Sequence, residues 1–205
     1  ERIEALRNLQ KAAVVLLRNE EGVAREGKYD FSGRKILPLR GLTGKLTIAI
    51  VGTAQTDSYG GGYNMGGSLG LPFISHQQNI RESIIAANPE AEIEWKYVLS
   101  SGSNNTPSEN DLNTIRDADL VIVMVNTNGD SAEDRDRQSI ALRNGKEKLV
   151  ERCAAVNENL ILLIEACGPV EVDKFIDKTK AIMWCGVLGS TMKVAFGPNL
   201  TGEYN

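Results

Sequence analysis

One stretch of the sequence decides the fold. It reads Asp119-Leu120-Val121-Ile122-Val123-Met124-Val125, and Asn126-Thr127-Asn128-Gly129-Asp130-Ser131-Ala132-Glu133-Asp134-Arg135-Asp136-Arg137 follows directly. The run from Leu120 to Val125 is apolar throughout and rich in β-branched residues, which is typical of a strand buried on both faces. In open α/β sheets, ligands bind in the crevice beyond the carboxyl ends of such strands. The polar segment 126–137, with its carboxylates and two arginines, is therefore the first candidate for a functional site.

Helical and strand patterns alternate along the rest of the chain. Helices are predicted over 1–18, 75–87, 108–118, from 144 to a turn at 157–159, 172–176 and 192–196. Strands are predicted over 46–51, 93–98, 120–125, 160–166 and 181–184. Several strands are apolar throughout, whereas residues 93–98 alternate and suit a half-exposed edge strand. The pattern predicts the α/β class: a three-layer α/β/α sandwich with a mostly parallel sheet and helices on both faces.

Two of the predicted helices begin with capping signals. Ser108 is followed three residues later by Asp111, and Asn144 is followed at the same spacing by Glu147. Residues 20–40 show neither period, and we expect a connecting loop or irregular hairpin there.

The composition excludes several classes of protein. The chain has 205 residues, of which 41% are hydrophobic, so one well-buried domain with at most a small appendage is expected. Lys and Arg number 23 against 27 acids, which argues against a nucleic-acid partner. No apolar run approaches the roughly 20 residues that span a bilayer, so no membrane partner is expected either. The chain begins with Glu1 rather than Met, so we expect further residues upstream, and a secreted, periplasmic or cytoplasmic location is equally compatible.

The side chains that usually bind metals or act as nucleophiles are few. Cys153, Cys167 and Cys185 are odd in number and widely spaced in apolar surroundings, so all three are predicted to be buried free thiols. His76 is the single histidine, which excludes a multi-histidine metal site, and we expect it at the surface at a helix N-terminus. Neither a metal nor a cofactor is predicted. If the chain serves an enzyme, its chemistry depends on carboxylates.

A glycine-rich segment, 53–70, follows the predicted strand 46–51. It lacks both G-x-G-x-x-G directly after the strand and G-x-x-x-x-G-K-[ST], so a nucleotide site is disfavoured and a loop over a cleft is favoured. Asp57, Tyr59 and Tyr63 could contact a polar ligand there, or the aromatic side chains could simply anchor the loop.

The polar segment 126–137 has two interpretations. Its charges could pair with one another in solvent and contribute little. Alternatively, an Asp-Arg pair could hold backbone groups through bidentate hydrogen bonds and support a neighbouring carboxyl as general acid or base. The position beyond a buried strand favours the second interpretation. Glycoside hydrolysis would also need a second carboxylate, which the pattern does not supply.

Seven motifs occur in a fixed order along the chain. They are AVVLLRNE at 13–20, ILPL at 36–39, KLTIAIVG at 45–52, GGY at 61–63, ADLVIVMV at 118–125, EDRDRQSIAL at 133–142 and GPV at 168–170. Together they resemble the C-terminal α/β-sandwich domain of family 3 glycoside hydrolases, the β-glucosidase and β-xylosidase family. The resemblance implies that the sandwich follows a (β/α)8 barrel. Residues 1–44 would then be a leading helix and linker from that barrel, and residues 45–205 the sandwich domain.

The resemblance also implies a mechanism and site residues. Glu133 would be the general acid/base of a retaining β-glycosidase that acts on a β-linked glucoside or xyloside oligosaccharide. Asp57, Tyr63, Asp136 and Arg137 would bind substrate or support the loop. The nucleophile would be an aspartate of the barrel, so the isolated chain is expected to be inactive.

The chain departs from the family pattern at three places. Asp134 stands where glycine is frequent, the turn after Trp184 is shortened, and the ending at 199–204 is altered. The alternative function is a non-catalytic carbohydrate-binding or scaffolding domain in which Glu133 is a surface charge.

Overall fold

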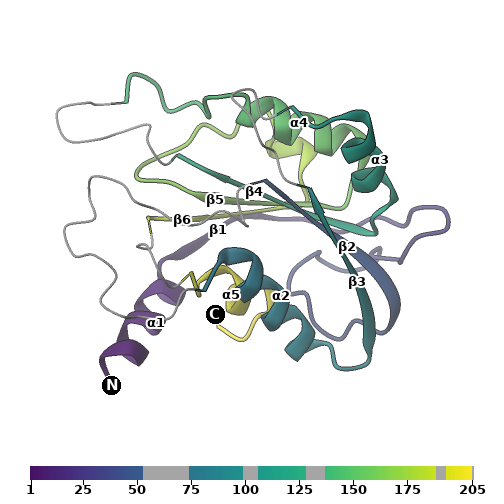
Figure 1. Cartoon of the computed structure of the whole chain (residues 1–205), viewed down its shortest axis with the longest axis horizontal. Coiled ribbons are helices and arrows are strands. Elements are labelled where there is room, and N and C mark those ends of the chain that lie inside the picture. Colours follow the sequence, from purple (N-terminus) through teal and green to yellow (C-terminus); the bar gives the residue numbers. More distant parts are fainter. Residues whose placement is uncertain (53–73, 99–105, 128–136, 188–192, 205) are drawn as a thin grey trace.

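A six-stranded sheet forms the centre of the part of the chain that the computed structural model describes, residues 1–52, 74–98, 106–127, 137–187 and 193–204. The strands are β1 (Val14–Asn19), β2 (Gly44–Gly52), β3 (Ala91–Val98), β4 (Leu120–Asn126), β5 (Leu160–Glu165) and β6 (Ala181–Cys185). Their order across the sheet is β1-β6-β5-β4-β2-β3 (Figure 1). Strands β2 to β6 pair in parallel, and β1 pairs antiparallel with β6. The mostly parallel sheet was predicted and is confirmed.

Helices cover both faces of the sheet (Figure 1). One side carries α1 (Arg2–Ala12), α2 (His76–Ala87) and α5 (Phe196–Thr201). The other side carries α3 (Glu109–Asp117), α4 (Lys146–Val156) and the short 3₁₀ helix η2 (Ile176–Lys178). The three-layer sandwich is therefore confirmed. None of the helices in the described ranges is long and apolar enough to cross a membrane.

The all-apolar sequence of β4 follows from this layering. Ile122 and Met124 belong to the core that α2 and α5 complete, whereas Val121, Val123 and Val125 belong to the core that α3 and α4 complete. Successive side chains of a strand point to opposite faces, so a strand covered on both sides needs apolar residues at every position. All of these side chains are at most 1% exposed.

The helix predicted over 1–18 is wrong beyond Ala12. Residues Val14–Asn19 form β1 at the edge of the sheet instead. The apolar run VVLL fits a short strand as well as a helix face, and periodicity alone does not separate the two. Pairing with β6 determines the outcome.

Residues 20–42 form the predicted irregular connection but contribute to the core. Glu21 and Lys35 form an isolated antiparallel bridge, while Phe31, Ile36 and Leu39 are fully buried. The division of the chain at residue 45 stays a proposal about where an upstream domain joins. Before residue 45, residues 14–42 already contribute strand β1 and several buried core side chains to the sandwich.

The two predicted helix caps have different outcomes. Ser108 caps α3 in a capping box with Asp111, as predicted. The box predicted from Asn144 and Glu147 is wrong, because Gly145 is the N-cap of α4 and makes no side-chain capping bond. Asn144 has φ 57°, a left-handed conformation that carries the chain into the helix by a turn rather than a cap.

The two short C-terminal helices are shifted along the chain from their predicted positions. The helix predicted over 172–176 is replaced by a turn and then η2. The one predicted over 192–196 begins only at Phe196, and Pro198 lies in its first turn. Proline is tolerated there because the first turn of a helix has no intrahelical acceptor for its N–H groups.

Candidate functional site

The carboxyl ends of the parallel strands form one edge of the sheet, and this edge is the candidate site. The strands end there at Gly52 (β2), Val98 (β3), Asn126 (β4), Glu165 (β5) and Cys185 (β6). The strand order reverses between β2 and β4, since β3 lies on one side of β2 and β4 on the other. Open α/β sheets bind ligands at the carboxyl end of such a reversal. Residues 53–73 and 128–136, which include most of the predicted site residues, follow β2 and β4 in the sequence.

Gly52 brings the two strands at the reversal unusually close. A Cβ at this position would lie 2.2 Å from the carbonyl oxygen of Met124, and the backbone has φ +97°. A side chain at this position would clash with β4, and the positive φ would strain its backbone. Both the close approach and the backbone conformation therefore require glycine.

Arg137 is the one predicted site residue that lies in a described range. Its Nη1 donates to the carbonyl oxygen of Pro169, 3.0 Å away, in the turn after β5. Its Nε and Nη2 are buried and have no hydrogen-bond partner among the described residues. The guanidinium thus fastens the end of segment 126–137 to the neighbouring turn, which is what a loop-supporting residue would do.

Glu133, Asp136, Asp57 and Tyr63 lie outside the described residues. Their assignments stay predictions, as does the loop-supporting role of Arg137.

Lys146 contacts the last residue of β4 through its ammonium group. Its side chain comes from the first turn of α4 and the residue is 7% exposed. Its Nζ donates to the backbone oxygen of Asn126 and lies 3.4 Å from the side-chain oxygen of the same residue. The sequence pattern did not single out this lysine. It holds the last residue of β4, directly before the polar segment.

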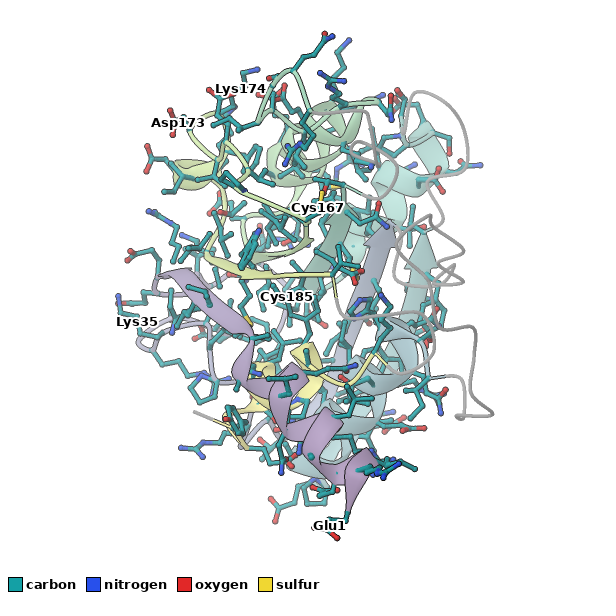
Figure 2. All side chains as sticks on the ribbon, turned by 90° about the vertical axis from the view of Figure 1, so that its left-hand side faces the viewer. Glu1, Lys35, Cys167, Asp173, Lys174 and Cys185 are labelled. Carbon is teal, nitrogen blue, oxygen red and sulfur yellow. The ribbon has the colours of Figure 1, made fainter. Side chains whose placement is uncertain are left out.

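Thr127 joins the ends of β4 and β5 beyond the strands themselves. Its N–H donates to the carbonyl oxygen of Glu165 at 3.0 Å, and its Oγ1 accepts from the N–H of Cys167 at 3.2 Å. Cys153 and Cys185 are buried as predicted, but Cys167 is exposed, so the prediction is wrong for this thiol. The residue lies in the turn beyond β5, where the sheet no longer covers it. Figure 2 looks onto this edge and shows Cys167 and Cys185 near its centre.

Three ionisable side chains meet in the interior behind the edge. Glu165 Oε1 lies 2.5 Å from Lys193 Nζ, and Glu165 Oε2 lies 3.2 Å from His76 Nε2. All three side chains are at most 1% exposed. We call Glu165, His76 and Lys193 the buried charge cluster. The predicted surface position of His76 is wrong: the residue does begin α2, but its ring lies against Phe196, with centroids 5.2 Å apart.

The electrostatics of the cluster keep Glu165 ionised. Burial raises the pKa of this carboxyl, but the hydrogen bond and charge of His76, together with those of Lys193, outweigh burial and lower the pKa to about 2. A general acid or base works best with a pKa near the operating pH. Glu165 is therefore unsuited to proton transfer at neutral pH. The sequence signal was a single carboxylate inside the apolar run 160–166, which the strand prediction passed over.

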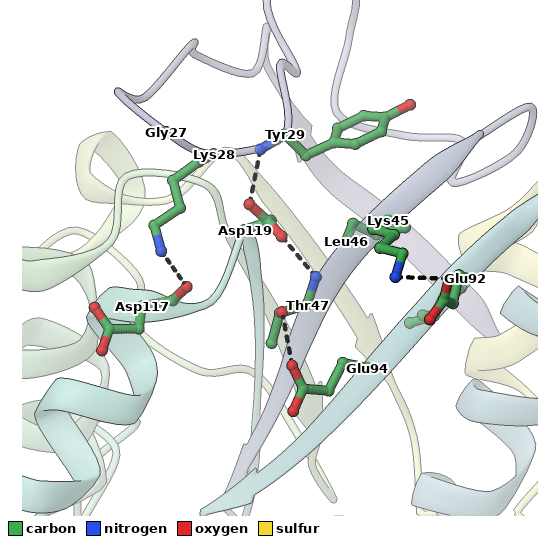
Figure 3. Close-up of a pocket in the computed structure, with 11 residues that line it drawn as sticks. Gly27, Lys28, Tyr29, Lys45, Leu46, Thr47, Glu92, Glu94, Asp117 and Asp119 are labelled. Atoms are coloured by element: carbon green, nitrogen blue, oxygen red, sulfur yellow. Dashed lines mark hydrogen bonds and ion pairs between the residues drawn. The ribbon is translucent and has the colours of Figure 1, made fainter.

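A hollow lies at the opposite edge of the sheet (Figure 3). It measures about 770 Å³ and is lined by the amino ends of β2 and β3 and by Asp119. Asp119 accepts hydrogen bonds from the N–H groups of Tyr29 (2.7 Å) and Thr47 (2.6 Å). One carboxylate oxygen thus binds the 20–42 segment and the other binds β2. We therefore interpret Asp119 as a structural residue that connects this segment to the sheet, and not as a ligand-binding group. In the described ranges, no group of three or more His, Cys, Asp or Glu residues is placed to hold a metal.

The fold and its edge define an α/β-sandwich domain with a candidate ligand site at the carboxyl ends of a mostly parallel sheet. The profile described as "Glycosyl hydrolase family 3 C-terminal domain" matches residues 14–205. The chain belongs to this family, as its motifs had indicated.

Individual relatives agree with this assignment. The chain is 26% identical to beta-glucosidase 1 of Aspergillus aculeatus, over 98% of the chain and 24% of that protein. It is 34% identical to probable beta-D-xylosidase 6 of Arabidopsis thaliana over 43% of the chain and 12% of the relative. The crystal structure of a GH3 beta-glucosidase from Bifidobacterium adolescentis superposes with a TM-score of 0.72 at 18% identity, covering 98% of the chain and 27% of that structure. This likeness shows the fold. The chain spans about a quarter of the length of the relatives that it matches along its whole length.

Proposed function

We propose that the chain is the second domain of a retaining β-glycosidase that hydrolyses a β-linked glucoside or xyloside oligosaccharide. The family match over residues 14–205 carries this proposal. The names of the relatives, a beta-glucosidase and a probable beta-D-xylosidase, support the two sugar classes.

Glu133 is the proposed acid/base of this domain. In the first step it protonates the departing glycosidic oxygen, and in the second it deprotonates the water that attacks the glycosyl-enzyme. Asp136 and Arg137 support its loop, and the hydrogen bond from Arg137 to Pro169 is in keeping with that role. Asp57 and Tyr63, in the segment after β2, contribute to the wall that binds the sugar.

The second carboxylate of the mechanism is proposed to come from an upstream (β/α)8 barrel. Retaining enzymes hold their two carboxyl groups about 5–5.5 Å apart. Glu165 does not qualify as the partner, because it is fully buried and paired with Lys193 and His76. The isolated chain is accordingly expected to hydrolyse nothing. The curated relative that matches the whole chain is about four times longer, which leaves room for such a barrel.

A substitution in the full-length protein tests the assignment. Glu133→Gln should lower kcat/KM by about 10²–10⁴ on substrates with poor leaving groups, because these need protonation, and much less on dinitrophenyl glycosides in the first step. Asp134→Asn is the matched control, since it removes the same charge from the adjacent position, and it should leave kcat/KM within a few-fold. Equal activity of Glu133→Gln and wild type on every substrate would show that Glu133 is not the acid/base.

A further inference from the structure

We infer that the buried charge cluster is a positioning device that fixes the chain segments around the proposed sugar site, without itself touching the sugar. The identification of the site rests on the proposed function. The role of the cluster is additional to the proposed function, because neither Lys193 nor Glu165 takes part in the proposed proton transfers.

Stability alone does not account for the cluster. Removing a carboxylate, an ammonium and an imidazole from water is costly, and apolar side chains of similar volume are often as stabilising as a buried ion pair. The apolar side chains around the cluster include Phe196, whose ring lies against that of His76, and the buried thiol of Cys185 belongs to the same core. Burial, together with the charge of Glu165, raises the pKa of Cys185, so this thiol adds no charge to the cluster. The cluster is therefore better explained by what its directional contacts hold in place.

Two members of the cluster come from segments that are far apart in the sequence. His76 is the first residue of α2, shortly after segment 53–73, and Lys193 directly follows segment 188–192. The two are also tied through the backbone, because the N–H of Lys193 donates to the carbonyl oxygen of Ile74 at 2.9 Å. Glu165 thus ties the residues that lead into α2 and α5 to the end of β5.

The end of β5, where Glu165 lies, and the turn after it contact both ends of the polar segment 126–137, which contains Glu133. The carbonyl oxygen of Glu165 accepts from the N–H of Thr127, the residue directly after β4. Four residues beyond Glu165, the carbonyl oxygen of Pro169 accepts from Arg137, the last residue of the polar segment. The end of β5 and its turn therefore hold the polar segment at its start and at its finish.

The cluster is suited to this task because its contacts are directional. A carboxylate that accepts from an ammonium on one oxygen and an imidazole on the other fixes the relative positions of three elements, whereas apolar contacts permit them to slide. A misplacement of about 1 Å can lower a catalytic rate about a hundredfold. We therefore expect an apolar replacement to retain the fold and to loosen the site.

The test compares three variants of the full-length protein by hydrogen exchange and by kcat/KM. The double variant Glu165→Leu/Lys193→Met replaces the two charged side chains by apolar side chains of similar size and so removes the directional contacts. Glu165→Gln retains a hydrogen-bonding group, and Leu149→Ala is a control that destabilises the core on the other face of the sheet. In the double variant, amide exchange in 74–79, 166–172 and 193–198 should rise at least about tenfold. kcat/KM should fall about 10- to 100-fold with an unchanged pH profile. Glu165→Gln leaves the buried Lys193 without its carboxylate and should give values between those of the double variant and wild type, whereas Leu149→Ala should keep kcat/KM within a few-fold of wild type.

Several outcomes overturn the inference. One is exchange in those three segments that stays unchanged, or that rises no more than elsewhere in the sheet, as in Leu149→Ala. Another is local loosening with no change in kcat/KM. If the double variant does not fold, Lys193→Met alone is measured against the same expectations. A wild-type protein without glycosidase activity would instead refute the proposed function and, with it, the sugar-site part of the inference, while the exchange pattern would still report whether the cluster holds the segments.

Discussion

The ionisation of Glu165 should make the folded chain sensitive to acid in a defined pH range. Burial raises the pKa of this carboxyl, but His76 and Lys193 outweigh burial and lower it from 4.5 to about 2. A group whose pKa is lower in the folded state stabilises that state above its unfolded pKa, and the stabilisation is lost as the pH falls toward the folded pKa. At about 1.4 kcal/mol per pKa unit, the difference amounts to about 3 kcal/mol above pH 5, of which about 2 kcal/mol is lost by pH 3.

The substitution Glu165→Gln removes this titration while retaining the size of the side chain. Free energies of unfolding would be measured by urea titration at several pH values, for the wild type, for Glu165→Gln and for the control Glu92→Gln. Glu92 pairs with Lys45 in solvent, so its substitution should leave the pH dependence nearly unchanged. The difference between wild type and Glu165→Gln should shrink by about 2 kcal/mol from pH 6 to pH 3. A difference that stays constant to within about 0.5 kcal/mol would refute an ionised Glu165 in the folded state.

Three further predictions concern the hydrogen bonds of Asp119, the close strand approach at Gly52 and the exposure of Cys167. Asp119→Ala removes the acceptor of two backbone N–H groups at 2.6 and 2.7 Å, so urea titration should show a loss of about 2–4 kcal/mol, and a loss below about 1 kcal/mol would contradict charge-assisted bonds there. Gly52→Ala places a methyl group 2.2 Å from a carbonyl oxygen, whereas Gly27→Ala meets nothing within 4 Å at a similarly positive φ. The melting temperature should therefore fall much further for Gly52→Ala, and equal decreases would argue against the close strand approach. A thiol reagent should modify Cys167 in the native protein and spare the two buried thiols; equal labelling of all three, measured by mass spectrometry, would contradict their burial.

The sheet could be predicted because its central strands carry strong local signals. The apolar run of β4 and the turn residues around it specify a strand covered on both faces, and the structure places it at the centre of the sheet. The alternation in 93–98 likewise indicated an edge, and β3 is an edge strand. Such patterns reflect burial of the segment itself, so they can be read without knowing its neighbours.

The errors arise where distant partners decide the local structure. Residues Val14–Asn19 become a strand because β6, far along the chain, offers them a ladder. His76 is buried with a partner from far along the chain, because Glu165 lies within hydrogen-bonding distance of its ring and itself pairs with Lys193 from a third segment. Neither of these long-range contacts produces a hydrophobic period in the local sequence, so the sequence pattern could not predict them.

The sequence could place segment 126–137 after the carboxyl end of a central strand, but it could not predict the side chains that surround that end. The rule that ligands gather at strand carboxyl ends led from β4 to segment 126–137, and Arg137 indeed contacts the turn after the next strand. The supporting groups, Lys146 and the buried charge cluster, were missed. A lone charged residue in an apolar run, as at Glu165, was the available signal, because an unpaired charge in the core is so costly that it implies a partner.

The acid/base role of Glu133 is tested most directly by azide rescue in the full-length protein. Glu133→Ala would be incubated with a dinitrophenyl β-glucoside or β-xyloside and sodium azide, and the products would be identified by NMR, with Asp134→Ala as the control. Loss of the general base stalls the glycosyl-enzyme, and azide attacks it without base assistance. We predict faster turnover in azide and a glycosyl azide of β configuration from Glu133→Ala, and only free sugar from Asp134→Ala. No rate increase and no glycosyl azide, or a product of α configuration, would contradict Glu133 as the acid/base of a retaining enzyme.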